Sequence, residues 1–468
     1  MKAQFDNSFS RLPAFLFERV EPTPIKNPKL IHVTKLKEKL GLKLSDEELT
    51  RWLNGELRLP GEQRIATRYA GHQFGHWAGQ LGDGRAISLG EIITEKGHRL
   101  EVQTKGSGLT PFSRMGDGKA VIRSSVREYL CSEAMAGLQI PTTGVLAILT
   151  GEDEVYRETI ENSSIVARVF PSNLRFGHFE MLYHYKKDDE LKALITYTRE
   201  TFFGGISVLE MLTEIVKRTA HLMADWMSVG FCHGVMNTDN MSVLGLTIDY
   251  GPFGFMEDTD LNFICNHSDE QGRYAYGQQP GVAQWNLSRL LACFTHEVEQ
   301  ADLQKLLDSY PEIFQSRFTE IGKQKLGLIN PDPIDQKLFL DLLQVMGKLN
   351  LDFTYTFHSL STDLKDFRNY YGKREEFESW LLRYEERLVR EETSDGDRKQ
   401  MMRKRNPKYI LRNYIAQEVI EDVEAGISVI MEKWLNVFSS PYEDHPHLNA
   451  YAMPTPYEKK NIIVSCSS

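Results

Sequence analysis

The sequence that decides the fold reads His233-Gly234-Val235-Met236-Asn237-Thr238-Asp239-Asn240, and Ile248-Asp249-Tyr250-Gly251 follows shortly after. Asn240 and Asp249 both carry side-chain oxygen atoms, the donors that Mg²⁺ prefers. The residues between them read as two short strand-like pieces, 241–246 and 247–250, which a hairpin would join. We therefore expect Asn240 and Asp249 to converge on one metal ion.

The spacing in this stretch is that of a protein-kinase catalytic loop. Kinases place an Asp two residues after the His and an Asn seven residues after it, and an Asp-Phe-Gly triplet follows. His233 and Asn240 keep the seven-residue spacing, and Asp249 begins the triplet Asp-Tyr-Gly. The place of the catalytic Asp, however, holds Val235, which cannot accept a proton. Asp239 supplies a carboxylate that can replace the missing base; the alternative is that it only caps a turn.

A lysine and a glutamate upstream fit the same pattern. Residues 99–105 alternate between apolar and polar side chains, which predicts a strand that ends at Lys105. Residues 120–138 carry an apolar stripe with helical spacing, and Glu128 lies in the middle of this segment. Kinases hold phosphates with a strand Lys that pairs with a helix Glu. The alternative is two unrelated surface charges.

Two glycine-rich turns flank the strand that ends at Lys105. They are Gly82-Asp83-Gly84-Arg85 and Gly116-Asp117-Gly118-Lys119. Glycine lets backbone N–H groups approach phosphate oxygens, and an arginine adds a charge-assisted fork. A lone Gly-Asp-Gly is more often a hairpin turn, and neither stretch has the spacing of a Walker A loop or a dinucleotide-binding fingerprint.

Arg168 and Arg175 flank the connector Pro171-Ser172-Asn173, which follows a strand predicted over 163–170. In a kinase this junction between lobes holds an adenine, so two arginines there suit a triphosphate better. The alternative is a pair of ordinary salt bridges between the lobes.

The pattern along the chain predicts an α+β protein with a bilobal, protein-kinase-like fold. Residues 1–65 read as an irregular, Pro-rich N-terminal extension with one helix near 35–56. Residues 66–172 form a strand-rich N-lobe, and 173–300 form a helical C-lobe that carries the catalytic loop. Residues 301–468 read as an all-helical extension that carries no chemical motif.

Composition narrows the class of protein. The chain has 468 residues, a formal net charge of −10 and 41% hydrophobic residues, which is typical of a globular protein. A nucleic-acid binder would more often be basic, so we expect none. No stretch approaches the length of a membrane span, and Asp6 comes early in an N-terminus without a long apolar run. We expect a cytoplasmic protein that has no membrane partner.

The five cysteines form no C-x-x-C pair, which argues against zinc ribbons and thioredoxin-type sites. Cys131, Cys232 and Cys293 have apolar neighbours and are expected in the core. Cys466 lies third from the end, where a free thiol is expected to be exposed and open to redox chemistry.

Longer stretches around these residues resemble the selenoprotein O family, kinase-like protein adenylyltransferases once regarded as pseudokinases. The resemblance is dense from about residue 65 to 290 and returns at the tail. The matching motifs are Tyr69-Ala70-Gly71-His72-Gln73-Phe74-Gly75, the turn at 82–85, Lys105-Gly106-Ser107-Gly108, 168–177, 233–240, 249–252, Cys265-Asn266-His267-Ser268-Asp269 and Val464-Ser465-Cys466-Ser467-Ser468.

The resemblance implies that ATP binds in the reverse of the usual kinase orientation. The γ-phosphate would lie among Lys105, Arg168 and Arg175, so that AMP is transferred to Ser, Thr or Tyr hydroxyls of proteins and pyrophosphate is released. Asn240 and Asp249 would hold Mg²⁺ or Mn²⁺, and Asp239 would accept the proton. Further contacts with the nucleotide would come from Gly82, Gly84, Arg85, Asp117, Gly118 and Asp249, with Glu128 orienting Lys105.

The resemblance also implies a regulatory disulfide between Cys265 and Cys466, where animal members carry selenocysteine near the C-terminus, and redox-related proteins as substrates. Other functions stay open at this point. The same site could transfer UMP from UTP with Mn²⁺, or phosphorylate a small molecule, although Val235 argues against a true kinase. A scaffold that binds nucleotide without turnover is the remaining alternative, and the retained Asp239, Asn240 and Asp249 argue against it.

Overall fold

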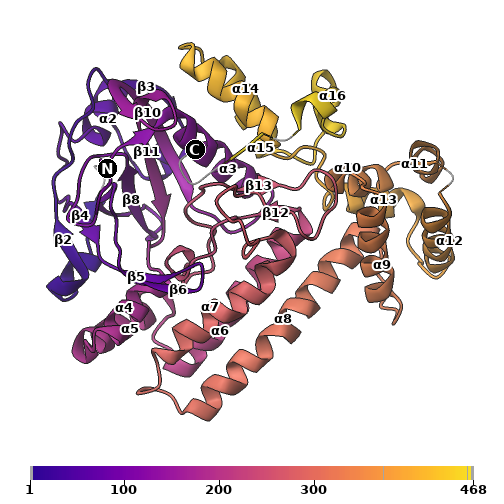
Figure 1. Cartoon of the computed structure of the whole chain (residues 1–468), viewed down its shortest axis with the longest axis horizontal. Helices are drawn as coiled ribbons and strands as arrows, with labels where there is room; N and C mark the ends of the chain where they lie inside the picture. Colours follow the sequence, from indigo (N-terminus) through magenta and orange to yellow (C-terminus); the bar gives the residue numbers. More distant parts are fainter. Residues whose placement is uncertain (1–3, 373, 461, 465–468) are drawn as a thin grey trace.

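The computed structural model describes residues 4–372, 374–460 and 462–464. It is an α+β structure, as the sequence predicts, in which a large antiparallel sheet comes first and helices follow (Figure 1). Within these residues, none of the helices combines the length and the apolar character needed to cross a membrane.

The large sheet contains nine strands in the order β2-β4-β7-β8-β11-β10-β3, with β1 beside β7 and β9 beside β11. All of its strand pairs are antiparallel. The strands are β1 (Gln4–Phe5), β2 (Phe17–Arg19), β3 (Lys29–Val33), β4 (Ile65–Thr67), β7 (Ala86–Ile93), β8 (Arg99–Lys105), β9 (Ala120–Val121), β10 (Gly144–Tyr156) and β11 (Ile160–Phe170). Strand β8 has the bounds that its alternating pattern predicts.

Both faces of the sheet are covered. Helix α3 (Ile122–Gly137) packs Val126 and its apolar neighbours against one face, where Val166 of β11 lies. On the opposite face, α2 (Asp46–Leu53) packs Trp52 against Val102 and its neighbours. The polar side of β8 is therefore also buried, and Gln103 has no solvent exposure.

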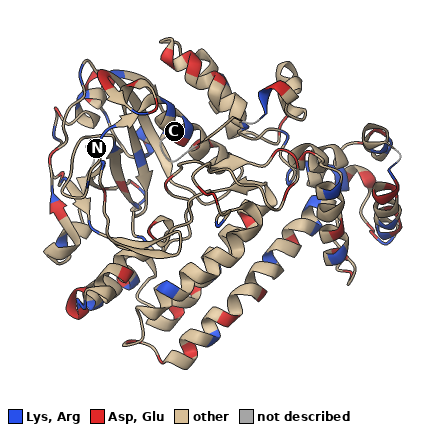
Figure 2. Cartoon of the chain, in the orientation of Figure 1, with Lys and Arg blue, Asp and Glu red and all other residues tan. Residues whose placement is uncertain are grey.

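The helices after the sheet begin with a layer in which α6, α7 and α8 lie side by side (Figure 1). The helices in this part are α4 (Phe176–His184), α5 (Asp188–Phe202), α6 (Val208–Ser228), α7 (Gln279–Ala292) and α8 (Gln300–Leu326). A capping box begins α6, in which Ser207 and Glu210 bond each other's backbone, and Gly327 ends α8 in the left-handed conformation that favours glycine. Acidic and basic residues are mixed along α8, whereas acidic residues gather in the first turn of α5 (Figure 2).

Two small hairpins lie between the sheet and these helices. One joins β5 (Ala70–Gln73) to β6 (His76–Gln80), and the other pairs β12 (Phe231–Cys232) with β13 (Gly254–Phe255). Strands β12 and β13 lie on either side of the stretch 233–253, which holds the catalytic-loop motif. Their pairing fixes both ends of this stretch to the helical core.

The C-terminal third is helical, as predicted, but it divides into two groups. Helices α9 (Asp335–Lys348), α10 (Phe353–Leu360), α11 (Leu364–Tyr371), α12 (Glu375–Leu388) and α13 (Asp395–Arg403) gather around their own core beside the end of α8. Then α14 (Asn413–Glu424) and α15 (Val429–Ser439) return to pack on α3, and the short α16 (Asn449–Ala452) follows. A Cβ at Gly137 of α3 would lie 1.7 Å from the carbonyl oxygen of Phe438, so this close approach requires glycine.

Two local predictions are wrong. Residues 241–250 form no hairpin, because their backbone groups bond to distant segments: Val243 donates to the Leu174 carbonyl at 3.1 Å and Thr247 to the Pro141 carbonyl at 2.8 Å. The N-terminal residues are also less irregular than expected. They supply β1, β2 and β3 to the sheet, and α1 (Leu36–Lys39) and α2 replace the single helix near 35–56.

Candidate active site

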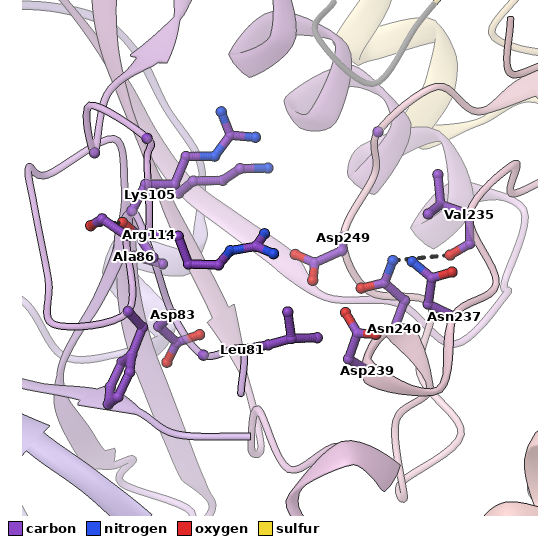
Figure 3. A pocket seen from close by; sticks show the side chains of 18 of the residues that line it. Leu81, Asp83, Ala86, Lys105, Arg114, Val235, Asn237, Asp239, Asn240 and Asp249 are labelled. Carbon is purple, nitrogen blue, oxygen red and sulfur yellow. Dashed lines mark hydrogen bonds between the residues drawn. The ribbon is translucent and has the colours of Figure 1, made fainter. Parts of the chain in front are cut away.

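A pocket of about 810 Å³ lies between the large sheet and the catalytic-loop stretch (Figure 3). Its walls are the turn at 82–85, the ends of β8 and β11, the loop 112–119, and the segments 235–240 and 249–252. It brings together nearly all residues predicted for the site: Gly82, Gly84, Arg85, Lys105, Asp117, Gly118, Arg168, Arg175, Asp239, Asn240 and Asp249. Glu128 lies behind Lys105, on α3.

Lys105 and Glu128 are paired as predicted. The Lys105 Nζ lies 2.5 Å from Oε2 of Glu128, and both side chains are buried. The other oxygen of Glu128 accepts a hydrogen bond from Arg168 at 3.3 Å. Burial lowers the pKa of Lys105, and this ion pair opposes the shift. Strands β8 and β11 thus present two cations to the pocket, and α3 places one carboxylate between them.

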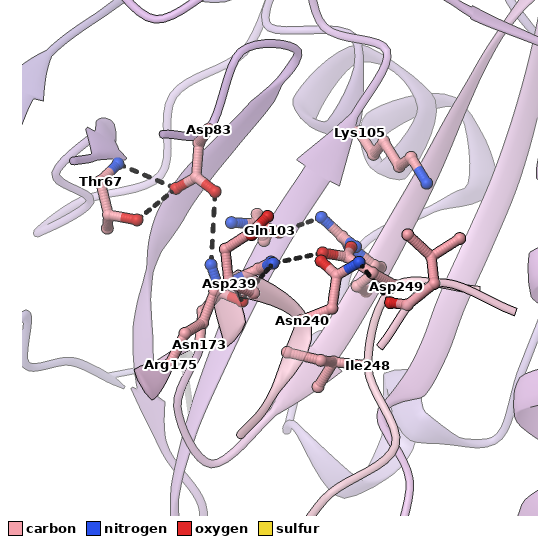
Figure 4. A network of polar contacts seen from close by, with 12 residues as sticks. Thr67, Asp83, Gln103, Lys105, Asn173, Arg175, Asp239, Asn240, Ile248 and Asp249 are labelled. Atoms are coloured by element: carbon pink, nitrogen blue, oxygen red, sulfur yellow. Dashed lines mark hydrogen bonds and ion pairs between the residues drawn. The ribbon is translucent and has the colours of Figure 1, made fainter. Parts of the chain in front are cut away.

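Asp249 lies between the two arginines of the predicted phosphate site (Figure 4). Its Oδ1 accepts a hydrogen bond from Arg168 at 2.6 Å, and its Oδ2 accepts one from Arg175. Burial alone would raise the pKa of Asp249, but Arg175 and Arg168 hold it well below its usual range. Both oxygens of this predicted metal ligand are therefore occupied by cations of the protein.

Arg175 is held from several sides. Its guanidinium donates to the side-chain oxygen of Asn173 at 2.9 Å and to the backbone carbonyl of Asp239 at 2.9 Å, and it stacks on Tyr69 at 4.8 Å. It precedes α4 immediately, while Arg168 lies within β11. Strand β11 therefore fixes Arg168, and the connector to α4 fixes Arg175, at the buried end of the pocket.

Asp239 has the surroundings of a proton acceptor. It lies in a short 3₁₀ turn, Thr238–Asn240, and only 6% of it is exposed. Its Oδ2 accepts a weak hydrogen bond from Gln73 at 3.3 Å, while Oδ1 is buried without a hydrogen-bond partner among the described residues. Burial raises the pKa of Asp239 to about 7, close to the pH at which a general base works best.

Asn240 points toward Asp249 across the pocket (Figure 3). Its amide nitrogen donates to the Val235 carbonyl at 2.9 Å, which orients the side-chain oxygen. No described residue donates a hydrogen bond to that oxygen. One amide oxygen and nearby carboxylates are a donor set that suits Mg²⁺ or Mn²⁺ when phosphate oxygens and water complete the shell. The residues therefore fit a divalent cation, provided that Asp249 is released from its arginines.

The two glycine-rich turns pack against the rest of the pocket wall. A Cβ at Gly84 would lie 2.9 Å from the Phe112 carbonyl oxygen, and one at Gly118 would lie 2.2 Å from the Gly108 carbonyl carbon. Asp117 pairs with Arg157 at 2.8 Å at the rim of the pocket, so its carboxylate is already engaged. Arg85 donates only to the Lys119 carbonyl, at 3.5 Å.

Sequence reasoning assigned no role to several residues of the site. Asp83 is buried and binds Thr67 through a backbone contact of 2.8 Å and a side-chain contact of 2.6 Å, so it fixes the glycine-rich turn (Figure 4). Gln73 contacts Asp239, and Arg114 lines the pocket. A signal existed for Gln73, which lies in the motif 69–75; for Arg114 the sequence offers only its place before a glycine-rich turn.

Cys265 lies away from the pocket lining and donates a hydrogen bond to the Cys232 carbonyl at 3.3 Å. Burial raises the pKa of its thiol. Cys131, Cys232 and Cys293 are buried, as predicted. Cys466 lies outside the described residues, but the last described residue, Val464, accepts a backbone hydrogen bond from His267 at 3.0 Å.

Comparison with known proteins agrees with this geometry. Residues 1–437 match the family model described as protein adenylyltransferase SelO. A protein of Bordetella petrii named protein nucleotidyltransferase YdiU is 44% identical over 489 aligned positions, which cover 99% of this chain and 98% of that protein. The proteins of the same name from Myxococcus xanthus and Yersinia pseudotuberculosis are each 42% identical, with 99% of this chain and 99% of each relative covered.

Proposed function

The chain belongs to the SelO family and is a nucleotidyltransferase, and from that premise we propose that it transfers AMP from ATP to hydroxyl groups of protein side chains. The observation that carries the proposal is the position of the candidate proton acceptor in the pocket. A buried carboxylate without a full set of partners, Asp239, stands beside Asn240, while Val235 fills the place where a kinase has its base. A kinase-like, bilobal arrangement is part of the same proposal.

ATP would bind with its γ-phosphate at the buried cations. Lys105, Arg168 and Arg175 present positive charge at one end of the pocket, and the connector and β8 hold them in place. With the γ-phosphate there, the α-phosphate lies nearer to Asp239, and the glycine-rich turns face the rest of the nucleotide. The cluster of arginines supports this orientation because guanidinium groups bind phosphate oxygens bidentately.

The proposed reaction follows from the places of Asp239 and the buried cations relative to the phosphates. The hydroxyl oxygen of the acceptor attacks the α-phosphorus, the bond from that phosphorus to the bridging oxygen breaks, and its electron pair leaves with pyrophosphate. Asp239 accepts the hydroxyl proton, and the buried cations stabilise the charge on the leaving group. Mg²⁺ or Mn²⁺ held by Asn240 and Asp249 would neutralise part of the phosphate charge.

Label transfer tests the proposal. The purified protein is incubated with a divalent cation and with ATP labelled at the α-phosphate or, in parallel, at the γ-phosphate. Label should enter protein from the α-position alone, and Asp239→Asn should abolish it. Label from the γ-position would mean a kinase and would overturn the roles given to Arg168, Arg175 and Asp239.

Two other functions remain as alternatives within the same design. Labelled UTP with Mn²⁺ tests uridylyl transfer by the same site. A scaffold that binds ATP without turnover would show binding but no covalent label. The retained Asp239, Asn240 and Asp249 argue against the scaffold.

We extend the proposal to redox control in the cytoplasm, with protein substrates that include redox proteins. The hydrogen bond between His267 and Val464 holds the tail beside the segment that carries Cys265, which supports a disulfide between Cys265 and Cys466. A cytosolic disulfide of this kind would be regulatory. Comparing label transfer with and without a reductant, in wild type and Cys466→Ser, tests the idea: the variant should not respond to the reductant.

A further inference from the structure

Arg114 is a charged residue of the pocket that the proposed reaction has not yet used. It projects from the loop 112–119 into the pocket and points toward Asp249 from the side on which Lys105 lies (Figure 3). It is exposed, and it has no hydrogen bond, ion pair or ring contact with any described residue. Arg114 thus lines the pocket without a partner among the described residues, and its guanidinium is available to a ligand.

The other basic residues of the pocket already have polar partners within the protein. They form the following ion pairs: Lys105 with Glu128, Lys119 with Asp153, Arg157 with Asp117, and Arg168 and Arg175 with Asp249. Arg85 contacts a backbone carbonyl. Among the described residues that line the pocket, Arg114 is therefore the cation without any polar contact.

The loop holds Arg114 in this position through its neighbours. Ser113 donates to the Gly84 carbonyl, and Thr110 donates to the Asp83 carbonyl at 2.7 Å, so the loop is fixed to the first glycine-rich turn. The Gly116 N–H then bonds to the Ser113 carbonyl at 2.8 Å and closes a tight turn around Arg114. Its backbone φ is +53°, in the left-handed region that non-glycine residues seldom adopt. Such backbone strain often occurs at functional sites.

We propose that Arg114, on the loop 112–119, binds the phosphate chain of the nucleotide and stabilises the charge that builds on the leaving pyrophosphate. The inference rests on the proposed function, and it adds a residue that contacts substrate. When the bond between the α-phosphorus and the bridging oxygen breaks, the electron pair moves onto pyrophosphate, and a guanidinium beside that oxygen stabilises it. The buried cations Lys105, Arg168 and Arg175 hold the γ-phosphate, whereas Arg114 reaches the phosphates from the exposed loop 112–119.

An alternative for the same side chain is stacking on the adenine base. The direction in which Arg114 points favours the phosphates, because its guanidinium is directed toward Asp249 (Figure 3), the residue that two buried arginines hold. The two ligand parts can be separated by using adenosine, which has the base and no phosphate.

Binding is measured by calorimetry with α,β-methylene-ATP and with adenosine, for wild type, Arg114→Ala, Arg114→Lys and the control Arg58→Ala. Arg58 is half-exposed and pairs with Glu21, so its removal changes net charge equally without touching the pocket. Arg114→Ala should weaken binding of α,β-methylene-ATP about tenfold to a hundredfold, as for a lost hydrogen bond to a charged group. Adenosine binding should not change, and Arg114→Lys should lie between.

The α-label assay on the same variants measures the catalytic part. Arg114→Ala should lower kcat by about a hundredfold, the loss typical of one oxyanion donor, while Arg58→Ala stays at the wild-type rate. Equal weakening of adenosine and α,β-methylene-ATP would place Arg114 on the base and refute the proposal. Values that match Arg58→Ala in both assays would show that Arg114 does not contact nucleotide. If wild type binds α,β-methylene-ATP but transfers no α-label, adenylyl transfer fails, and the binding data still decide the role of Arg114.

Discussion

Replacing Asp249 by Asn removes one negative charge from between two buried arginines. The side chains of Arg168 and Arg175 are only 4% and 2% exposed. Arg168 keeps Glu128 as a partner, but Arg175 keeps only neutral acceptors, on Asn173 and on the backbone of Asp239. Breaking a buried ion pair from one side costs about 3–5 kcal/mol, and the amide oxygen of Asn still accepts one hydrogen bond, so we expect about 3 kcal/mol.

In thermal unfolding this loss corresponds to a Tm lower by about 3 °C, because the entropy of unfolding of a chain of this length is about 1 kcal/mol per kelvin. ATP in EDTA should restore more stability to Asp249→Asn than to wild type, because the triphosphate supplies the missing negative charge without displacing a carboxylate. Adding Mg²⁺ should then raise Tm further in wild type and not in the variant. The assay is a thermal melt followed by fluorescence, with and without each ligand.

A matched control exists in the C-terminal helices. Asp352 pairs with Arg412 at 2.8 Å, and both side chains are 2% exposed, far from the pocket lining. Asp352→Asn should lose comparable stability, and ATP should not restore it. If ATP and Mg²⁺ shift wild type and Asp249→Asn by equal amounts, Arg168 and Arg175 do not form the phosphate site and Asp249 is not a metal ligand.

Three further outcomes are expected. Asp239→Asn should lower α-label transfer by about 10²- to 10⁴-fold without weakening the binding of α,β-methylene-ATP. The kcat/KM of the wild-type protein should rise with pH and level off above about 7, because Asp239 must be deprotonated to act as the base. A flat pH profile would argue against Asp239 as the base. Glu101 is buried, and burial raises its pKa to about 8 from an ordinary value of 4.5. The folded protein therefore keeps a proton that the unfolded chain releases, so stability should fall as pH rises from about 4.5 to 8, by up to about 1.4 kcal/mol per pH unit. Unfolding of Glu101→Gln should lack this slope. Gly177→Ala should destabilise the protein and impair α-label transfer, because the new Cβ would lie 2.1 Å from the carbonyl oxygen of Ala70, in the β5–β6 hairpin beside Asp239. An unchanged Tm and an unchanged rate of transfer would show that this hairpin moves freely.

The parts of the fold that were predictable are those whose pattern is local. Strand β8 was found from its alternation and α3 from its apolar stripe, because each repeats within its own residues. The chain between Asn240 and Asp249 has the same short apolar runs, but its backbone partners, Leu174 and Pro141, lie far away in sequence. Local pattern cannot distinguish such a segment from a hairpin.

The chemistry of the site was predictable from residue types, whereas its pairing was not. Carboxylates, amides and arginines at kinase-like spacing indicated a phosphate and metal site. That Asp249 accepts from both Arg168 and Arg175 depends on contacts across 81 and 74 residues. The direction of Arg114 depends on Ser113 and Gly84, which only the folded loop brings together.

The packing of α14 and α15 on α3 has a consequence for how the protein is made. A chain emerging from the ribosome that ends after α7 already contains every residue that lines the pocket, from Tyr69 to Pro252. It still lacks the two helices that cover α3, including Phe438, whose carbonyl contacts the position of Gly137. Helix α3, which holds Glu128 facing Lys105, packs on β10 and β11 by then, but the part of it that contacts α14 and α15 stays uncovered until residues 413–439 have been synthesised. Synthesis of the pocket residues therefore precedes, by more than 150 residues, the full enclosure of the helix that carries one partner of the Lys105–Glu128 ion pair.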